Sequence, residues 1–185
     1  EPDTLHSRVV DYLKSENEKY WAFIVHRLDR ETSGVMILAK HKRHKDYLQE
    51  QFANREVHRI YHALVEGKPE KAAGTIREWL LEDKFLKVKA VKKNHPKAKE
   101  AITHYSVVDS DDYASLIQLT IETGRRHQIR VGLANLGCPV VGDESHGAEG
   151  NPIGRIALHA SSLEFLHPET DDPVRFEAPI PFGPE

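Results

Sequence analysis

Strand-like alternation of apolar and polar residues dominates this chain. The stretch VHRIYHALVE, residues 57–66, alternates between two faces and predicts a strand, which Gly67 and Pro69 end. Shorter stretches of strand-forming composition predict further strands at 21–25, 35–39, 75–81, 85–91, 101–108, 114–122, 156–159 and 174–178. Turn-forming stretches such as DSDD (109–112) and HPETDDP (167–173) separate several of them.

Three segments instead repeat their apolar residues with the period of a helix: 4–15, 43–53 and 126–136. Gly137 follows the third segment and is expected to end it. Many strands joined by short turns, with few helices, predict an α+β fold in which helices pack on a mixed, mainly antiparallel sheet. The chain has 185 residues, enough to bury a core, and we expect one domain over residues 1–185.

Composition narrows the class of protein further. Apolar residues make up 39% of the chain, and no apolar run reaches the ~18 residues that a membrane span needs, so we expect no membrane partner. The single cysteine, Cys138, cannot form a disulfide within the chain, and the first residues are acidic and polar, unlike a signal peptide. These features favour a cytoplasmic protein.

Charge is unevenly distributed along the chain. The formal net charge is −3, which by itself argues against a nucleic-acid partner. Residues 84–99, however, contain seven lysines and no acidic residue, whereas residues 143–185 contain nine acidic residues and two arginines. One face of the molecule can therefore be basic and suited to phosphates although the whole is mildly acidic.

The loop HRLDRETSG, residues 26–34, is unusually polar for a connection between two apolar stretches. Asp29 within it is either a turn residue that accepts backbone hydrogen bonds or a reacting group. Arginines stand at positions 27 and 30, and functional side chains are often carried by loops that rigid strands hold in place. The loop is therefore a candidate site.

A second candidate is the stretch ETGRRHQIR around Gly124. A glycine between a strand and a helix is expected to bring backbone amides and the helix N-terminus towards an anion. Arg126, His127 and Arg130 are expected on one face of the helix. Arginine is suited to holding a carboxylate in fixed geometry, and a partly buried Asp29 needs such a cation to stay ionised.

Both stretches, together with YHALVEG (61–67), GCPVVGD (137–143) and ALHASSLEFLHP (157–168), resemble the RluA-type pseudouridine synthases. Order and spacing match from about residue 4 to residue 182. The combination of HRLD-x-x-TSG with TGR-x-HQIR is highly specific for this family.

The resemblance implies a catalytic domain with a cleft across one sheet face, which converts uridine in rRNA or tRNA to pseudouridine without a metal or an organic cofactor. It implies that Asp29 is the essential aspartate, that Tyr61 stacks on the target base and that Arg130 pairs with the aspartate. The substrate contacts that it implies are Arg27, which takes part in extruding the base, Ile129, which lines the pocket, and Thr32, Arg125 and His127.

The chemistry leaves two questions open at this point. Asp29 either attacks C1′ of the ribose or removes the proton from C2′, and either Tyr61 or a water takes the final proton from C5 of the base. Two other functions fit the same residues: a protein that only binds RNA, and a hydrolase that releases free uracil.

Three positions depart from the family pattern. Arg126 replaces a small hydroxyl residue, Gly132 stands where a histidine is common, and His146 stands where tyrosine is usual. We therefore expect differences in substrate contacts and not in the reaction. The family's upstream strand with its Lys-Pro-x-Gly element is not found in this sequence, so the RNA is recognised either by this catalytic domain alone or by a longer chain.

A metal site is not expected, although the chain has 12 histidines. His58 and His62 have the spacing that binds zinc on a helix, but in a strand they lie ~13 Å apart, too far to share one ion.

Overall fold

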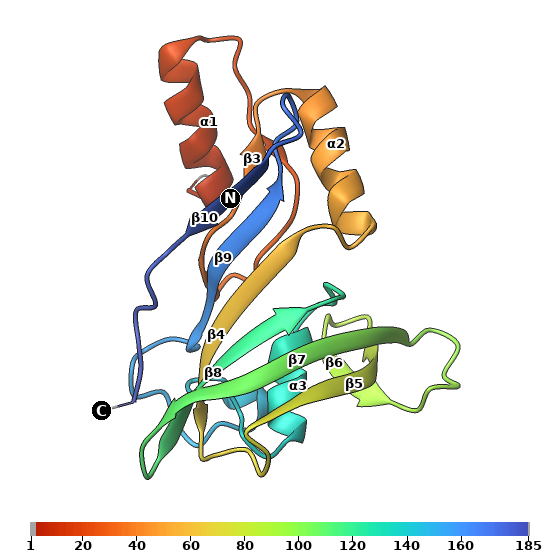
Figure 1. The fold of residues 1–185 in the computed structure, drawn as a ribbon, viewed down its shortest axis with the longest axis vertical. Helices are drawn as coiled ribbons and strands as arrows, with labels where there is room; N and C mark the ends of the chain where they lie inside the picture. Colours follow the sequence, from red (N-terminus) through yellow and green to blue (C-terminus); the bar gives the residue numbers. More distant parts are fainter. Residues whose placement is uncertain (1–2, 185) are drawn as a thin grey trace.

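The structure, a computed structural model that describes residues 3–184, is built on one large sheet (Figure 1). Its strands are β2 (Ser33–Gly34), β4 (His58–Glu66), β5 (Ala73–Glu82), β6 (Val88–Val91), β7 (Lys99–Ser110), β8 (Ala114–Ile121), β9 (Leu158–Leu166) and β10 (Pro173–Glu177). The order in space is β10-β9-β4-β8-β7-β5-β6, and all of these neighbours are antiparallel. Because β2 pairs with β9 in parallel, the sheet is mixed and mainly antiparallel, as predicted.

Helices pack at both ends of this sheet. They are α1 (Leu5–Glu16), α2 (Lys42–Ala53) and α3 (Gln128–Asn135), with a 3-10 turn η1 (Glu144–His146) after α3. Figure 1 shows α1 and α2 towards the end that carries β9 and β10, and α3 at the opposite end against β5, β6 and β7. The α+β class is thereby confirmed. Within residues 3–184, no helix has the length and apolar character needed to cross a bilayer.

The two strands predicted around the polar loop are shorter than expected. β1 (Phe23–Ile24) and β3 (Leu38–Ala39) pair antiparallel, and between them the chain crosses to β9. At this crossing Gly34 has a φ of +118°, and the Val35 amide donates to the Ala160 carbonyl at 2.8 Å. A Cβ on Gly34 would overlap that carbonyl, so the crossing requires glycine.

Two other element boundaries differ from the prediction for local reasons. The strand expected from residue 85 begins at Val88, because the Asp83 carboxylate accepts hydrogen bonds from the amides of Phe85 and Lys87 and closes a turn. The helix expected from residue 126 begins at Gln128, because His127 has a left-handed φ of +55°. Arg126 and His127 therefore precede α3, and the prediction that they share a helical face with Arg130 is wrong.

Apolar packing holds α3 against the sheet. Ile129 and Leu133 are buried in one cluster with Ile76 of β5 and Ile117 of β8. A separate cluster packs Leu48 of α2 against β9. β4 lies between β9 and β8, and its residues Tyr61, Ala63, Leu64 and Val65 belong to the first of these clusters.

Candidate active site

Asp29 lies on the loop between β1 and β2, and its backbone makes the turn there. Its carbonyl oxygen accepts the Thr32 amide at 2.9 Å. Its carboxylate is 25% exposed and lies 3.5 Å from Nη1 of Arg130. No amide of the described chain donates to this carboxylate, so the Asp29 side chain faces a cation and a cavity and does not serve as a turn acceptor.

The far end of this loop is held to β9 through Ser33. Its hydroxyl lies 2.8 Å from Nδ1 of His159 and accepts Nη2 of Arg155 at 2.7 Å. Since Nε2 of His159 lies 3.0 Å from the Ala178 carbonyl, that nitrogen carries the ring proton, and Nδ1 accepts from Ser33. The polar loop is therefore anchored four residues beyond Asp29.

The guanidinium of Arg130 is buried and gripped chiefly by Asp143. Nε and Nη2 of Arg130 donate to the two carboxylate oxygens of Asp143 at 2.9 and 2.8 Å, and Nη2 lies 3.3 Å from the Ser145 hydroxyl. Arg130 is 5% exposed and Asp143 is 1% exposed. This planar two-bond pair fixes the plane of the guanidinium and leaves Nη1 directed towards Asp29.

Opposing effects set the pKa values of this pair. Burial alone would lower the pKa of Arg130, but the hydrogen bonds and charge of Asp143, with a smaller contribution from Asp29, outweigh it and raise the pKa. Burial would raise the pKa of Asp143, but Arg130 outweighs burial and lowers it. Both groups are therefore charged near neutral pH. Sequence reasoning missed Asp143, although the motif GCPVVGD that it ends was part of the resemblance.

β4 contributes Tyr61 and Arg59, which lie two residues apart and thus on the same face of the strand. Tyr61 is 8% exposed. Burial raises the pKa of Tyr61, the nearby Arg59 opposes this, and the charge of Asp29 adds to it, so the phenol is protonated at neutral pH. Arg59 was not singled out from the sequence, and alternation along β4 from Tyr61 is the signal that points to it.

A buried glutamine fixes the segment between β8 and α3. Nε2 of Gln128 donates to the Ile102 carbonyl of β7 at 3.0 Å, and its Oε1 accepts the Thr123 hydroxyl and the Arg125 amide. Nε of Arg125 donates to the Glu100 carbonyl at 3.0 Å. The TGRRHQ turn is therefore a rigid wall, and His127 lies on it in its left-handed conformation.

All eight residues that the sequence assigned to the site line one cavity that opens to solvent. They are Arg27, Asp29, Thr32, Tyr61, Arg125, His127, Ile129 and Arg130. Leu28, Arg59, Ile121, Gly124, Gln128 and Leu158 complete the lining. The structure brings the three distant segments together, and the roles of the residues remain predictions.

Gly124 has a different function from the one expected. It does not begin α3, which starts four residues later. A Cβ at this position would come within 3.0 Å of Nη1 of Arg59, so the small residue leaves room for that guanidinium. The start of α3, with His127, Gln128 and Ile129, lines the same cavity as Gly124, and the expected approach to an anion stays a prediction.

The three departures from the family pattern have distinct surroundings. Nε of Arg126 lies 3.7 Å from the Glu82 carboxylate. Gly132 faces β5, where a Cβ would approach Glu78 and Ile76 to 3.3 Å, so α3 packs closely there. Nε2 of His146 lies 3.2 Å from Nδ1 of His127.

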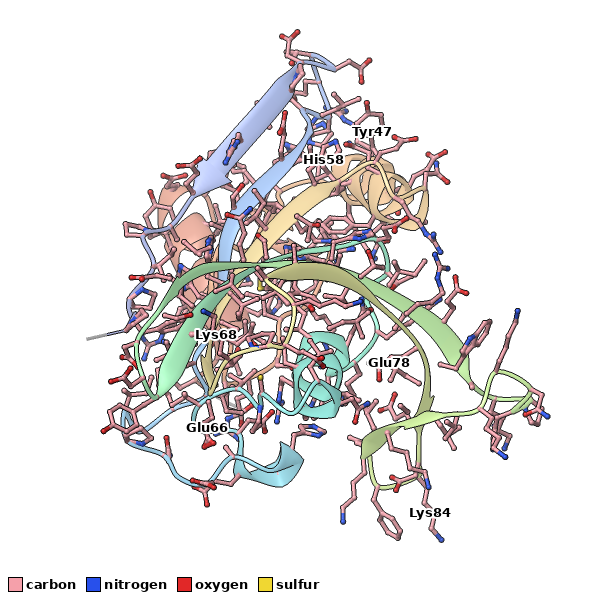
Figure 2. All side chains as sticks on the ribbon, turned by 60° about the horizontal axis from the view of Figure 1, so that its bottom comes forward. Tyr47, His58, Glu66, Lys68, Glu78 and Lys84 are labelled. Carbon is pink, nitrogen blue, oxygen red and sulfur yellow. The ribbon has the colours of Figure 1, made fainter. Side chains whose placement is uncertain are left out.

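Lysines extend the site along the β5–β6 hairpin. Figure 2 shows Lys84 at the projecting tip of this hairpin, away from the body of the sheet. A neighbouring groove is lined by Lys97, Lys99, Arg125 and Arg126 together with the acidic Glu82 and Asp83, and it shares the two arginines with the cavity mouth. Two lysines of the basic segment therefore lie in a groove next to the Asp29 cavity.

The described residues hold no cluster of three or more histidine, cysteine, aspartate or glutamate side chains arranged to bind a metal ion. His58 and His62 lie on β4, as the strand prediction required, and Nδ1 of His62 lies 2.6 Å from the Ser161 hydroxyl.

Known proteins that are similar to this chain in sequence or in fold support a family assignment. The family model described as RNA pseudouridylate synthase matches residues 1–135. The "Uncharacterized RNA pseudouridine synthase YhcT" of Bacillus subtilis is 39% identical over 159 residues, which cover 85% of this chain and 52% of that protein. The "Ribosomal large subunit pseudouridine synthase D" of Xanthomonas campestris pv. campestris is 37% identical, covering 86% of this chain and 53% of that protein.

Solved structures agree with the sequence relatives. "Human RNA Pseudouridylate Synthase Domain Containing 4" has a TM-score of 0.78 at 26% identity and covers 93% of this chain and 77% of its own. "Human RNA Pseudouridylate Synthase Domain Containing 1" has a TM-score of 0.77 at 27% identity, and the match covers 92% of this chain and 73% of that structure's chain. The chain spans 52% and 60% of the length of two curated relatives from Bacillus subtilis. On these matches and on its RluA-type motifs, the chain belongs to the RNA pseudouridylate synthase family.

Proposed function

We propose that this protein isomerises uridine in RNA to pseudouridine and that Asp29 is the reacting carboxylate. The observation that carries the proposal is the shared cavity, in which Asp29 faces Arg130 and lies in the same lining as Tyr61. We propose further that residues 1–185 form one catalytic domain and that it works in the cytoplasm, where its free buried thiol at Cys138 stays reduced.

The reaction breaks the N1–C1′ bond, turns the uracil and joins C5 to C1′. Bond breaking makes C1′ electron-deficient, and the Asp29 carboxylate stabilises that charge or removes a neighbouring proton. Arg130 faces the Asp29 carboxylate and orients it, and Asp143 in turn fixes Arg130. One proton leaves C5 and one reaches N1, so the base changes its attachment without a net change in composition.

The cavity walls suit a flipped base. Tyr61 presents an aromatic ring, and stacking contributes about 1–3 kcal/mol per base. Because Tyr61 is a protonated phenol, its role is stacking, and a water accepts the C5 proton only after the C5–C1′ bond has formed. The apolar side chains of Leu28, Ile129 and Leu158 exclude water and so favour reattachment over hydrolysis.

Basic residues around the mouth would contact the RNA backbone. Arg27 is exposed at the mouth, where it can hold the strand from which the base has been extruded. Arg125, Arg126 and the lysine-rich segment 84–99 continue from it. Two relatives are named ribosomal large subunit pseudouridine synthases, so large-subunit ribosomal RNA is the first substrate to test, with transfer RNA second.

RNA tritiated at uracil C5 tests the proposal directly. Isomerisation releases tritium to water, hydrolysis releases labelled uracil, and binding alone releases neither. We expect wild-type protein to release tritium from an RNA transcript and to form pseudouridine in the digested product. Release of free base, or of nothing from either RNA class, would overturn the proposal.

Asp29→Asn and Asp29→Ala separate the reaction from binding. Both variants are expected to lose tritium release and to bind RNA within a few-fold of wild type, because phosphate contacts come from other residues. The matched control is Asp46→Asn on the exposed face of α2, which should keep wild-type release. Turnover near wild type in either Asp29 variant would refute the assigned role.

A further inference from the structure

Arg59 is a cation in the cavity that lacks a counter-ion. Its side chain is partly buried and lines the same cavity as Asp29 and Tyr61. Within residues 3–184 no carboxylate lies within 4.0 Å of it, and its Nε is buried without a hydrogen-bond partner. A buried guanidinium in this state is costly and calls for a physical explanation.

The fold holds this cation in place without neutralising it. The guanidinium lies over the Phe52 ring at 5.3 Å from its centroid. On the other side a Cβ on Gly124 would come within 3.0 Å of Nη1, so the backbone there fits closely against Arg59. Burial lowers the pKa of Arg59, with Tyr61 acting in the opposite direction. The site is therefore preorganised around a charge that the Tyr61 phenol contacts and that no carboxylate of residues 3–184 neutralises.

Its position distinguishes Arg59 from the arginines that would bind phosphate. Arg27 and Arg126 are exposed and line the open mouth. Arg59 does not line that mouth; it lines the Asp29 cavity, partly buried beside Ile121 and Leu158. A partly desolvated cation suits a group that enters with the base rather than one that stays on the solvated strand.

We propose that Arg59 is a further catalytic residue, which donates hydrogen bonds to a carbonyl oxygen of the uracil as the N1–C1′ bond breaks. This inference rests on the proposed function. The electron pair of that bond leaves with the uracil and spreads over N1 and the two carbonyl oxygens. The same pair later forms the C5–C1′ bond, after which C5 loses its proton to solvent and N1 gains one. Arg59 keeps all of its protons throughout.

This arrangement favours the transition state over the bound uridine. In uridine the carbonyl oxygens are neutral and satisfy the guanidinium only partly. Once the bond breaks, the uracil carries a negative charge next to a fixed cation in a water-poor cavity, where such interactions are strongest. Asp29 and Arg59 then serve opposite fragments, the carboxylate the electron-poor sugar and the guanidinium the electron-rich base.

The test compares uridine with 5-fluorouridine in the same RNA under single-turnover conditions, following the disappearance of the substrate nucleoside. Fluorine withdraws electrons and makes uracil a better leaving group, so less help from Arg59 is needed. For Arg59→Gln we expect about a 100-fold slower conversion of uridine, a loss typical of one transition-state donor, and a loss of less than about 10-fold with 5-fluorouridine. Arg59→Lys, which keeps the charge, should fall between Arg59→Gln and wild type.

Two controls make the outcome decisive. RNA affinity of the Arg59 variants should stay within about 3-fold of wild type, whereas Arg126→Gln at the mouth should weaken RNA binding equally for both substrates. Thermal unfolding and circular dichroism show whether each variant is folded. If Arg59→Gln does not fold, the rates on the two substrates are compared for Arg59→Lys instead.

Equal rate losses on the two substrates, or a loss confined to RNA affinity, would overturn the role of Arg59 and leave the proposed function standing. If wild-type protein converts neither substrate, the proposed function itself fails and this inference fails with it.

Discussion

Arg130 lies closer to Asp143 than to Asp29. Its two hydrogen bonds to Asp143 measure 2.9 and 2.8 Å, whereas its nearest approach to Asp29 is 3.5 Å. The short bonds hold the guanidinium in place, and the long contact leaves the Asp29 carboxylate able to move towards a substrate. One acid is thus structural and buried, and the other is 25% exposed and available for chemistry.

Asp143→Asn should damage both folding and activity. It removes the charge that compensates buried Arg130, and breaking a buried pair typically costs about 3–5 kcal/mol. Urea unfolding measures the stability, and tritium release measures the activity. The paired replacement of Arg130→Met with Asp143→Leu should restore most of the stability but no activity, because no cation then faces Asp29. Activity in this double variant would contradict the pairing argument.

Arg130→Lys should show that geometry matters as well as charge. An ammonium cannot make the planar two-bond contact with Asp143 while also facing Asp29, so we expect about a 100-fold slower tritium release. Lys92→Ala, in the basic segment, should instead weaken RNA binding by a few-fold, and less so at high salt. Similar activity losses in the two variants would indicate that Arg130 is only part of a basic surface.

His26 should make stability depend on pH. Burial, with a contribution from Arg59, lowers the pKa of His26 from 6.5 to about 4, and its Nε2 accepts the Ile37 amide at 3.0 Å. Between pH 4 and 6.5 the unfolded chain binds a proton that the folded chain does not. The contribution of His26 to stability is therefore fully present above pH 6.5, and its loss lowers the free energy of unfolding by about 3 kcal/mol as the pH drops to 4.

His26→Gln keeps an acceptor for the Ile37 amide but does not titrate. Unfolding free energies of the two proteins at pH 7 and pH 4.5 should show a smaller loss in the variant. All other titratable groups are the same in both proteins, so the difference between them isolates His26. Equal losses of unfolding free energy in the two proteins would show that His26 is not the origin of the pH dependence.

Two glycines with positive φ offer a matched comparison. Gly34 (φ +118°) would place a Cβ onto the Ala160 carbonyl, whereas Gly67 (φ +75°) has open space there. Gly67→Ala should cost only the left-handed backbone penalty of about 1–2 kcal/mol. Gly34→Ala should cost at least about 3 kcal/mol and reduce tritium release, because the crossing to β9 positions the Asp29 loop. Equal unfolding temperatures for the two variants would show that a Cβ at position 34 does not overlap the Ala160 carbonyl.

The regular elements were largely predictable because their signals are local. β4 was expected at 57–66 and forms at 58–66, and α2 was expected at 43–53 and forms at 42–53. The α+β class followed from the number of short strands. The parallel pairing of β2 with β9 was missed, because it depends on a contact between residues 126 positions apart rather than on any local period.

In the candidate site, too, some residues could be predicted from the sequence and others could not. Motif residues such as Asp29 and Tyr61 were found because the family pattern includes them. Asp143 and Arg59 were missed because the case for them rests on burial and on what lies next to them, and a single sequence shows neither. The start of α3 was misplaced because nothing in the local pattern predicts a left-handed His127.

The contact between Asp29 and Arg130 joins positions 101 residues apart. During synthesis, a chain that has passed residue 100 but not residue 130 carries Asp29, Tyr61 and Arg59 without the guanidinium that faces the acid. If the proposed function is right, a chain that ends before Asp143 should therefore not modify RNA.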